Sequence, residues 1–187
     1  MFVPRWWTWH STAADGSDIW ELKDGPADEQ LWLDAAYADQ SLITQVGPLH
    51  ADYASHGDRP SGLPTSSSTL PGLIVQLARQ GYLDEGPDVL DVGTGSGYGC
   101  AVLTTRLGEQ HVAGVDIDEY LTKAAAGRLA SIGLRPQVVT ADATGPLPRT
   151  YDRCPPDPAK LAHRATARQA PAHHHHRHCS HPDRRQN

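Results

Sequence analysis

A glycine-rich turn between an apolar run and a helical segment is the feature that most constrains this chain. Residues 89–98 read Val-Leu-Asp-Val-Gly-Thr-Gly-Ser-Gly-Tyr. The apolar start predicts a buried strand, and the apolar periodicity of residues 98–107 predicts a helix. Glycine is required because a backbone that reverses tightly against a ligand has no room for a Cβ atom. The sequence therefore predicts a strand, a turn and a helix whose first N–H groups are exposed to a polar ligand.

Several nucleotide-type ligands use such turns, and the flanking residues discriminate between them. A phosphate-binding loop ends in Gly-Lys-Ser/Thr, whereas residues 97–99 are Gly-Tyr-Gly and supply no lysine. A nicotinamide dinucleotide site has Gly-x-Gly-x-x-Gly, whereas this turn is Gly-x-Gly-x-Gly with Asp91 two residues before it. An aspartate there repels a pyrophosphate, but it attracts a cation or accepts the N–H groups of the loop. S-adenosylmethionine (SAM), which carries a sulfonium, an ammonium and no phosphate, fits this charge.

Two further predicted strands also end in aspartate. Residues 111–115 are followed by Asp116, and residues 136–140 by Ala141 and then Asp142. Asp116 lies 23 residues after Gly93, close to the ~20-residue spacing at which an acidic side chain meets ribose hydroxyls in βαβ units. The alternative is that each aspartate only caps the following helix, and we assign this role to Asp118.

The motif resembles that of a known family. Residues 88–103 (DVLDVGTGSGYGCAVL) are similar to the first motif of class I SAM-dependent methyltransferases, and most closely to that of the protein-L-isoaspartate O-methyltransferases, VLEIGTGSGY. Upstream, Thr69-Leu70-Pro71 stands where the family has Ser-Gln-Pro, and Phe2-Val3-Pro4 and Ala38-Asp39 resemble further landmarks. The resemblance covers residues 1–153, and the Trp-rich opening is more similar to the branch found beside ATP-grasp enzymes of peptide maturation.

The resemblance implies an α/β fold with a Rossmann-like class I methyltransferase sheet, of which about the first three strands are present. Residues 1–69 are expected to form an aromatic N-terminal arm, a helix and a substrate-side loop, and residues 70–153 the SAM-binding half. Within the arm, residues 1–27 are expected to be irregular. Helical sequence precedes the Phe-Val-Pro landmark in the family, so we expect the chain to be truncated at its N-terminus.

Smaller elements follow from local patterns. Residues 28–37 predict a short helix with acidic residues in its first turn, and residues 41–46 predict a strand. Residues 47–68 are rich in Gly, Pro, Ser and His and predict a loop. Residues 70–77 have helical apolar spacing, with hydroxyl residues and Pro71 at their start.

Two groups of site residues are implied by the resemblance. Ser68 and Thr69 are the expected catalytic residues, which hold the acceptor carboxylate together with free N–H groups at the start of the following helix. The expected cofactor-binding residues are Asp91, Gly93, Thr94, Gly95, Ser96, Gly97, Tyr98, Asp116, Ile117, Asp142 and Ala143. No metal ligand is expected.

The implied activity is SAM-dependent carboxyl O-methylation of an aspartyl or isoaspartyl side chain of a peptide or protein. The methyl ester then cyclises to a succinimide. Because a carboxylate is ionised at neutral pH, no general base is required, and catalysis reduces to placing the reacting atoms in line. The alternative is a truncated, non-catalytic remnant that binds SAM or a peptide partner without turnover, and we expect weak activity from this chain alone.

Composition excludes other classes. With 187 residues and 39% hydrophobic content, a single domain with a core is feasible. There is no run of ~20 apolar residues and no basic segment followed by an apolar one, so neither a membrane span nor a signal peptide is expected. Three cysteines without paired spacing indicate a reduced, cytoplasmic protein. The net charge of -6 hides an acidic body, because residues 154–187 carry six Lys and Arg against two Asp; nucleic acid is therefore not an expected partner.

The last 34 residues depart from the family pattern. Residues 147–153 resemble the family's lead-in to a fourth strand, but residues 154–187 hold three early prolines and seven of the eleven histidines. This composition predicts disorder. The histidines and Cys179 could bind a transition metal, but they lack the spaced ligands of a structural site. We favour a frame change just after Arg153 as the origin of this tail.

Overall fold

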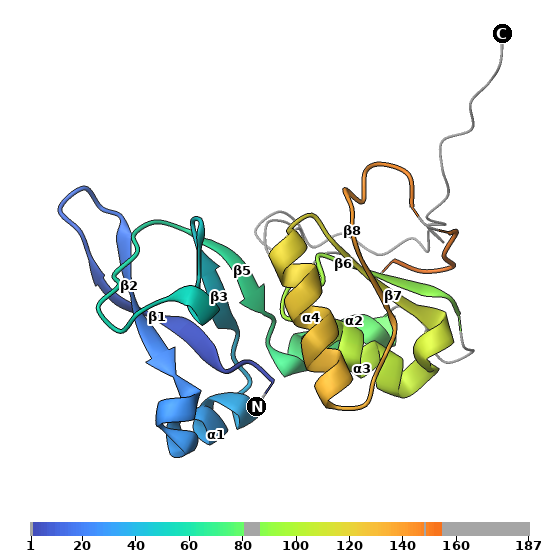
Figure 1. The fold of residues 1–187 in the computed structure, drawn as a ribbon, viewed down its shortest axis with the longest axis horizontal. Coiled ribbons are helices and arrows are strands. Elements are labelled where there is room, and N and C mark those ends of the chain that lie inside the picture. The colour runs from blue at the N-terminus through green and yellow to red at the C-terminus, as the bar shows by residue number, and fades with distance from the viewer. Residues whose placement is uncertain (1, 81–86, 148, 155–187) are drawn as a thin grey trace, which may run out of the picture. The chain divides into compact units, whose positions relative to one another are not determined.

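The computed structural model of the protein describes residues 2–80, 87–147 and 149–154, which belong to two compact units, each with its own sheet (Figure 1). The first unit is Met1–Ile74 and the second is Val75–Asn187. Among the described residues, no helix is both long and apolar enough to cross a membrane.

The first unit is an antiparallel sheet of five strands. Its strands are β1 (Arg5–Thr12), β2 (Asp18–Asp24), β3 (Leu42–Val46), β4 (Leu49–His50) and β5 (Pro64–Ser68). The order is β2-β1-β3-β4, and β5 pairs with β3 outside this order. Helix α1 (Glu29–Tyr37) lies between β2 and β3, and two 3-10 turns, η1 (Gly25–Ala27) and η2 (Ala51–Tyr53), complete the unit.

Large apolar side chains from this sheet form the core of the first unit. Trp7 is 1% exposed and packs with Trp20, Leu22 and Val46. Burial of each such side chain contributes roughly 1.5–3 kcal/mol relative to exposure. The tryptophans at positions 7 and 20 are therefore core residues of the unit.

The prediction that residues 1–27 are irregular is wrong, because they form the β1–β2 hairpin. Trp6 and Trp7 are both buried, so β1 lacks the strict alternation that marks a half-buried strand. β2 alternates, but one of its buried positions is Asp24, whose charge is paired with Arg5 at 2.9 Å. The overlooked signal was Asp15-Gly16, a hairpin-turn dipeptide in which Gly16 has φ +85°.

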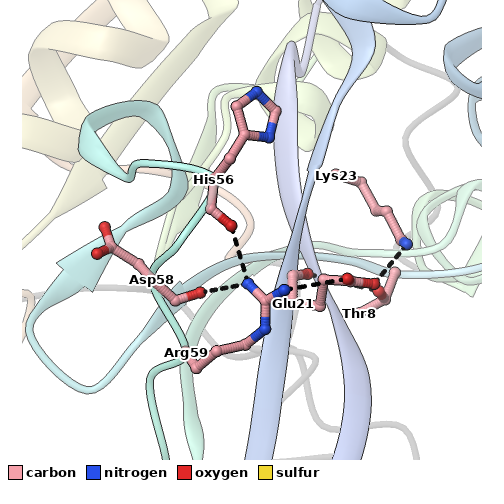
Figure 2. Close-up of polar contacts among 6 residues, drawn as sticks. All are labelled: Thr8, Glu21, Lys23, His56, Asp58 and Arg59. Atoms are coloured by element: carbon pink, nitrogen blue, oxygen red, sulfur yellow. Dashed lines mark hydrogen bonds and ion pairs between the residues drawn. The ribbon is translucent and has the colours of Figure 1, made fainter.

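The predicted loop over residues 47–68 is also wrong in part, because it contains β4 and β5. Between these strands, Arg59 donates to the carbonyls of His56 and Asp58 at 2.9 Å each and to the Glu21 carboxylate at 3.3 Å (Figure 2). Glu21 also pairs with Lys23 at 2.7 Å. These contacts hold the connection against β2, and the polar β5 forms because β3 offers it a free edge.

The second unit is a parallel sheet with helical crossovers. Its elements are α2 (Pro71–Gln80), which begins at the end of the first unit, β6 (Val89–Val92), α3 (Tyr98–Leu107), η4 (Glu109–His111), β7 (Val112–Asp116), α4 (Glu119–Ser131) and β8 (Gln137–Thr140). The strand order is β6-β7-β8, with all pairs parallel. Four of the five residues of β7 are buried, as expected for a central strand that is covered on both faces.

Strand order changes direction at β6. After β8, the chain returns to the opposite edge of β6, where Arg153 pairs in parallel with Val89 and accepts the N–H of Leu90 at 3.0 Å. Tyr151, 3% exposed, joins the core cluster of Leu90, Ala113 and Val115. In open α/β sheets, ligands bind beyond the carboxyl ends of strands at such a reversal. The fold therefore points to the turn after β6.

The predicted α/β fold class with a Rossmann-like parallel sheet is confirmed, with three parallel strands among the described residues. The predicted strands at 89–92, 111–115 and 136–140 and the helices at 28–37, 70–77 and 98–107 are present, with small shifts of their ends. The predicted disordered tail lies outside the described residues, apart from Cys154.

Candidate cofactor and acceptor sites

Two of the three aspartates predicted at strand ends, Asp91 and Asp116, lie at the same edge of the parallel sheet, the one formed by the carboxyl ends of its strands. Asp91 of β6 pairs with Gly114 of β7, and Asp116 at the end of β7 pairs with Thr140 of β8. Because the strands are parallel, their carboxyl ends share this edge. The glycine turn starts from the same edge.

The glycine turn is held by backbone hydrogen bonds to β7. Gly93 and Thr94 donate their N–H groups to the carbonyl of Val115 at 2.9 and 3.1 Å. Gly95 donates to the carboxylate of Asp116 at 2.9 Å. The turn therefore has three of its N–H groups committed to protein acceptors.

The same is true at the start of α3. Gly97 donates to the carbonyl of Thr94 at 2.8 Å, and Tyr98 donates to the Ser96 hydroxyl at 3.3 Å. The predicted exposed N–H groups are therefore not free at these positions. A pyrophosphate needs free N–H groups as hydrogen-bond donors, whereas most N–H groups of this turn already donate to protein acceptors.

Close packing explains one glycine of the turn. Gly97 has φ +87°, and a Cβ atom there would lie 3.0 Å from the Cβ of Ala125 in α4. Both the left-handed backbone and the approach of α4 therefore require glycine. Ala125 was not predicted as part of the site, because no local pattern shows which residue a neighbouring helix presents to the turn.

Asp91 is the electrostatic centre of this edge. One of its carboxylate oxygens, Oδ2, is buried and has no hydrogen-bond partner among the described residues. Burial raises the pKa of Asp91 to about 6, and the nearby Asp116 carboxylate adds to the rise, whereas the Thr94 side chain and the Cys100 backbone N–H oppose it. A buried carboxylate of this kind is completed by a cation or a strong donor.

Cys100, in the first turn of α3, is a buried thiol that follows the glycine turn closely in sequence. Burial, with a contribution from the Asp91 carboxylate, raises the pKa of Cys100 to about 12. The thiolate is the reactive form of cysteine. Cys100 is therefore a packing residue and not a nucleophile.

Asp116 and its neighbours divide into different roles. Asp116 also accepts the N–H of Asp118 at 3.1 Å through its second oxygen. Asp118 caps α4 by accepting the N–H groups of Tyr120 and Leu121, which confirms its predicted role. Between the two aspartates, Ile117 is 74% exposed and presents an apolar surface beside the acidic edge.

The third predicted acidic position is arranged differently. Asp142 accepts both the N–H and the hydroxyl of Thr144, at 2.8 and 2.7 Å, and these bonds lower its pKa. Ala143 packs against the core cluster of the sheet. Both residues thus stabilise the turn after β8.

The predicted acceptor residues lie in the first unit. Ser68, 7% exposed, ends β5, and the half-buried Thr69 follows it. Two N–H groups predicted to be free at the start of α2 are occupied: Leu70 donates to the Ser41 hydroxyl at 3.1 Å and Gly72 to the Asp39 carboxylate at 2.7 Å. That part of the prediction is wrong, and the hydroxyls of Ser68 and Thr69 remain the candidate groups.

No group of three or more metal-ligating side chains occurs in the described part of the chain. The histidine-rich stretch that could bind a metal lies outside it.

Comparison with known proteins agrees with this geometry. Residues 89–155 match the family model described as a methyltransferase domain. Two ribosomal protein L11 methyltransferases are similar, one from Dictyoglomus turgidum, 60% identical over 40 residues, and one from Dictyoglomus thermophilum, 42% identical over 65 residues. These matches cover 21% and 34% of this chain and only 13% and 21% of the relatives.

A solved protein-L-isoaspartate O-methyltransferase shares the fold. The TM-score is 0.50 at 23% identity, and the match covers 65% of this chain and 35% of that one. The chain thus spans about a third of that structure and less of the Dictyoglomus relatives. Residues 89–155, with their glycine turn and acidic edge, therefore match a methyltransferase domain of the type whose methyl donor is S-adenosyl-L-methionine.

Proposed function

We propose that this protein is a SAM-dependent carboxyl O-methyltransferase that acts on an aspartyl or isoaspartyl side chain of a peptide or protein. The observation that supports it most combines two features. Among the described residues, one buried oxygen of Asp91 has no hydrogen-bond partner, and most N–H groups of the glycine turn already donate to protein acceptors. Together they favour a cationic ligand over a phosphate.

The residues at the carboxyl ends of β6 and β7 fit the methyl donor, SAM. The Asp91 carboxylate would accept the ammonium group. The Asp116 carboxylate, which has about four acceptor positions and uses two, retains capacity for ribose hydroxyls. The exposed Ile117 would cover the adenine ring. When bound, SAM supplies a methyl group that passes from its sulfonium sulfur to the acceptor.

On the acceptor side, Thr69 and Ser68 would orient the acceptor carboxylate by donating their hydroxyl hydrogens to it. The carboxylate oxygen then forms the new bond to the methyl carbon, and no proton has to be removed. Orientation of this kind accelerates a reaction by holding the atoms in the attack geometry. The assignment rests on the resemblance of Thr69-Leu70-Pro71 to the family's Ser-Gln-Pro.

A polypeptide acceptor has separate support. Both Dictyoglomus relatives are named for methylation of a ribosomal protein. A ribosomal protein is therefore the second candidate acceptor, and a remnant that binds SAM without turnover is the alternative from a different class.

One assay separates these possibilities. The chain is incubated with methyl-labelled SAM and, in parallel, an isoaspartyl peptide, its aspartyl twin and ribosomal protein L11. Label that base releases as methanol shows an ester and supports the proposal. Base-stable label on the ribosomal protein would replace it with amine methylation. SAM binding in calorimetry with no transfer to any acceptor would support the remnant. Thr69→Val, which has a similar shape but no hydroxyl, tests whether the Thr69 hydroxyl is needed for the transfer.

A further inference from the structure

The segment before β3 and the segment after β5 lie side by side, just beyond the paired residues Leu42 and Ser68. The two strands are antiparallel, so the start of β3 meets the end of β5. This arrangement brings residues 39–41 next to residues 69–72, which are about 30 positions away in sequence.

Two side chains of the first segment anchor the second. The Ser41 hydroxyl accepts the N–H of Leu70 at 3.1 Å, and the Asp39 carboxylate accepts the N–H of Gly72 at 2.7 Å. Pro71, between them, has no N–H group. Thr69 is thus bracketed on one side by the paired Ser68 and on the other by the anchored Leu70.

Gly72 permits the closest of these contacts. A Cβ atom at this position would lie 2.5 Å from one oxygen of Asp39 and 2.9 Å from the other. Glycine is unfavourable inside a helix, because it loses more conformational freedom on folding than any other residue. The approach of Asp39 gives a physical reason for glycine in the first turn of α2.

We propose that Asp39 and Ser41 are positioning residues that fix the backbone of Thr69, and through it the hydroxyl that orients the acceptor carboxylate. This inference rests on the proposed function of Thr69. Small misplacements of an orienting group cost large factors in rate, whereas a helix cap alone affects only stability. Asp39 is therefore expected to affect turnover per folded molecule.

The test compares Asp39→Ala, Asp39→Asn and Ser41→Ala in the full chain. Asparagine keeps an oxygen acceptor for the Gly72 N–H, whereas alanine removes it. Asp39→Ala is expected to lower kcat about 10- to 100-fold, with Asp39→Asn within about threefold of wild type. Asp34→Asn, an exposed aspartate of α1, is the charge-matched control. The affinity for S-adenosylhomocysteine is expected to stay unchanged in all of them.

A second pair of variants tests the close contact between Gly72 and the Asp39 carboxylate by filling the space between them. Gly72→Ala drives a methyl group into the Asp39 carboxylate, whereas Gly127→Ala in α4 meets nothing within 4 Å. Gly72→Ala is expected to lower kcat as Asp39→Ala does, and Gly127→Ala to leave kcat unchanged.

Amide hydrogen exchange tests whether Asp39 holds this backbone, and it does so without an activity measurement. Asp39→Ala is expected to speed exchange at Leu70 and Gly72 at least tenfold, and Asp34→Asn to leave it unchanged. Unchanged exchange in Asp39→Ala, or equal loss of kcat in Asp39→Asn and Asp39→Ala, would overturn the inference. Wild-type protein that transfers no methyl group refutes the proposed function, and the exchange data still decide whether Asp39 holds the turn.

Discussion

The carboxylate of Asp116 accepts the backbone N–H of Gly95 at 2.9 Å and so joins the end of β7 to the middle of the glycine turn after β6. Its other oxygen accepts the N–H of Asp118 at 3.1 Å. One side chain therefore sets the position of the turn and of the start of α4.

Replacing Asp116 by alanine leaves both N–H groups without their acceptor. We expect the free energy of unfolding to fall by roughly 1–3 kcal/mol, as for other unsatisfied part-buried donors. The affinity for S-adenosylhomocysteine, measured by calorimetry, should fall at least about tenfold. Glu29→Ala, at an exposed position of the first unit, is the control. Wild-type affinity in Asp116→Ala would show that the carboxylate has no part in the cofactor site.

Asp91 is expected to make both stability and cofactor affinity depend on pH. Its pKa is about 6 in the folded protein against an ordinary 3.8. Between these values, the folded protein keeps a proton that the unfolded chain has lost. The contribution of Asp91 to stability is therefore present below about pH 4 and lost as the pH rises through about 6.

Asp91→Asn removes this ionisation. We expect the variant to be more stable than wild type by roughly 1–3 kcal/mol above pH 6, in urea unfolding at several pH values. Wild-type affinity for SAM should rise with pH up to about 6 and then level off, because the ionised form binds the cation. The variant should bind weakly at every pH, and a wild-type affinity that is flat from pH 4.5 to 7.5 would contradict this role.

Gly97→Ala tests the contact between the turn and α4. The variant places a side chain at φ +87° and 3.0 Å from the Ala125 Cβ. The matched control is Gly133→Ala, with φ +82° and nothing within 4 Å. We expect the control to lose about 1–2 kcal/mol from backbone strain and Gly97→Ala to lose a further ~1–3 kcal/mol from overpacking.

Adding Ala125→Gly to Gly97→Ala should recover part of the overpacking loss, apart from the helix cost of the new glycine. A double-mutant cycle in urea would measure this coupling. Equal destabilisation in Gly97→Ala and Gly133→Ala would show that α4 yields without cost.

Tyr151→Phe should stabilise the second unit. The Tyr151 ring is buried, its hydroxyl has no hydrogen-bond partner among the described residues, and Arg149 lies over the ring at 5.1 Å. Phenylalanine keeps the ring and removes the unsatisfied group, so we expect a gain of about 1 kcal/mol in thermal or urea unfolding. Tyr37→Phe, at an 87% exposed position, should change nothing. A loss of stability in Tyr151→Phe would reveal a partner for the hydroxyl.

Part of the first unit could not be predicted because its signals are not local. β5 is a run of Pro, Thr and Ser that becomes a strand only by pairing with β3. The two consecutive buried tryptophans of β1 break alternation. Position 24 is a buried carboxylate that is paired with Arg5. In each case, a partner distant in sequence supplies the stabilising contact.

The second unit was largely determined by its sequence. An apolar run, three glycines and a periodic segment specify β6, the turn and α3, because backbone sterics and apolar spacing act within a few residues. Asp118 likewise caps a helix that starts at the next residue. Only the tertiary structure decided where the hydrogen bonds of the turn go. The carbonyl of Val115 and the carboxylate of Asp116 take its donors, and burial leaves one oxygen of Asp91 without a partner. Hydrogen-bond partners and burial depend on chain segments brought together by folding, which no local pattern encodes.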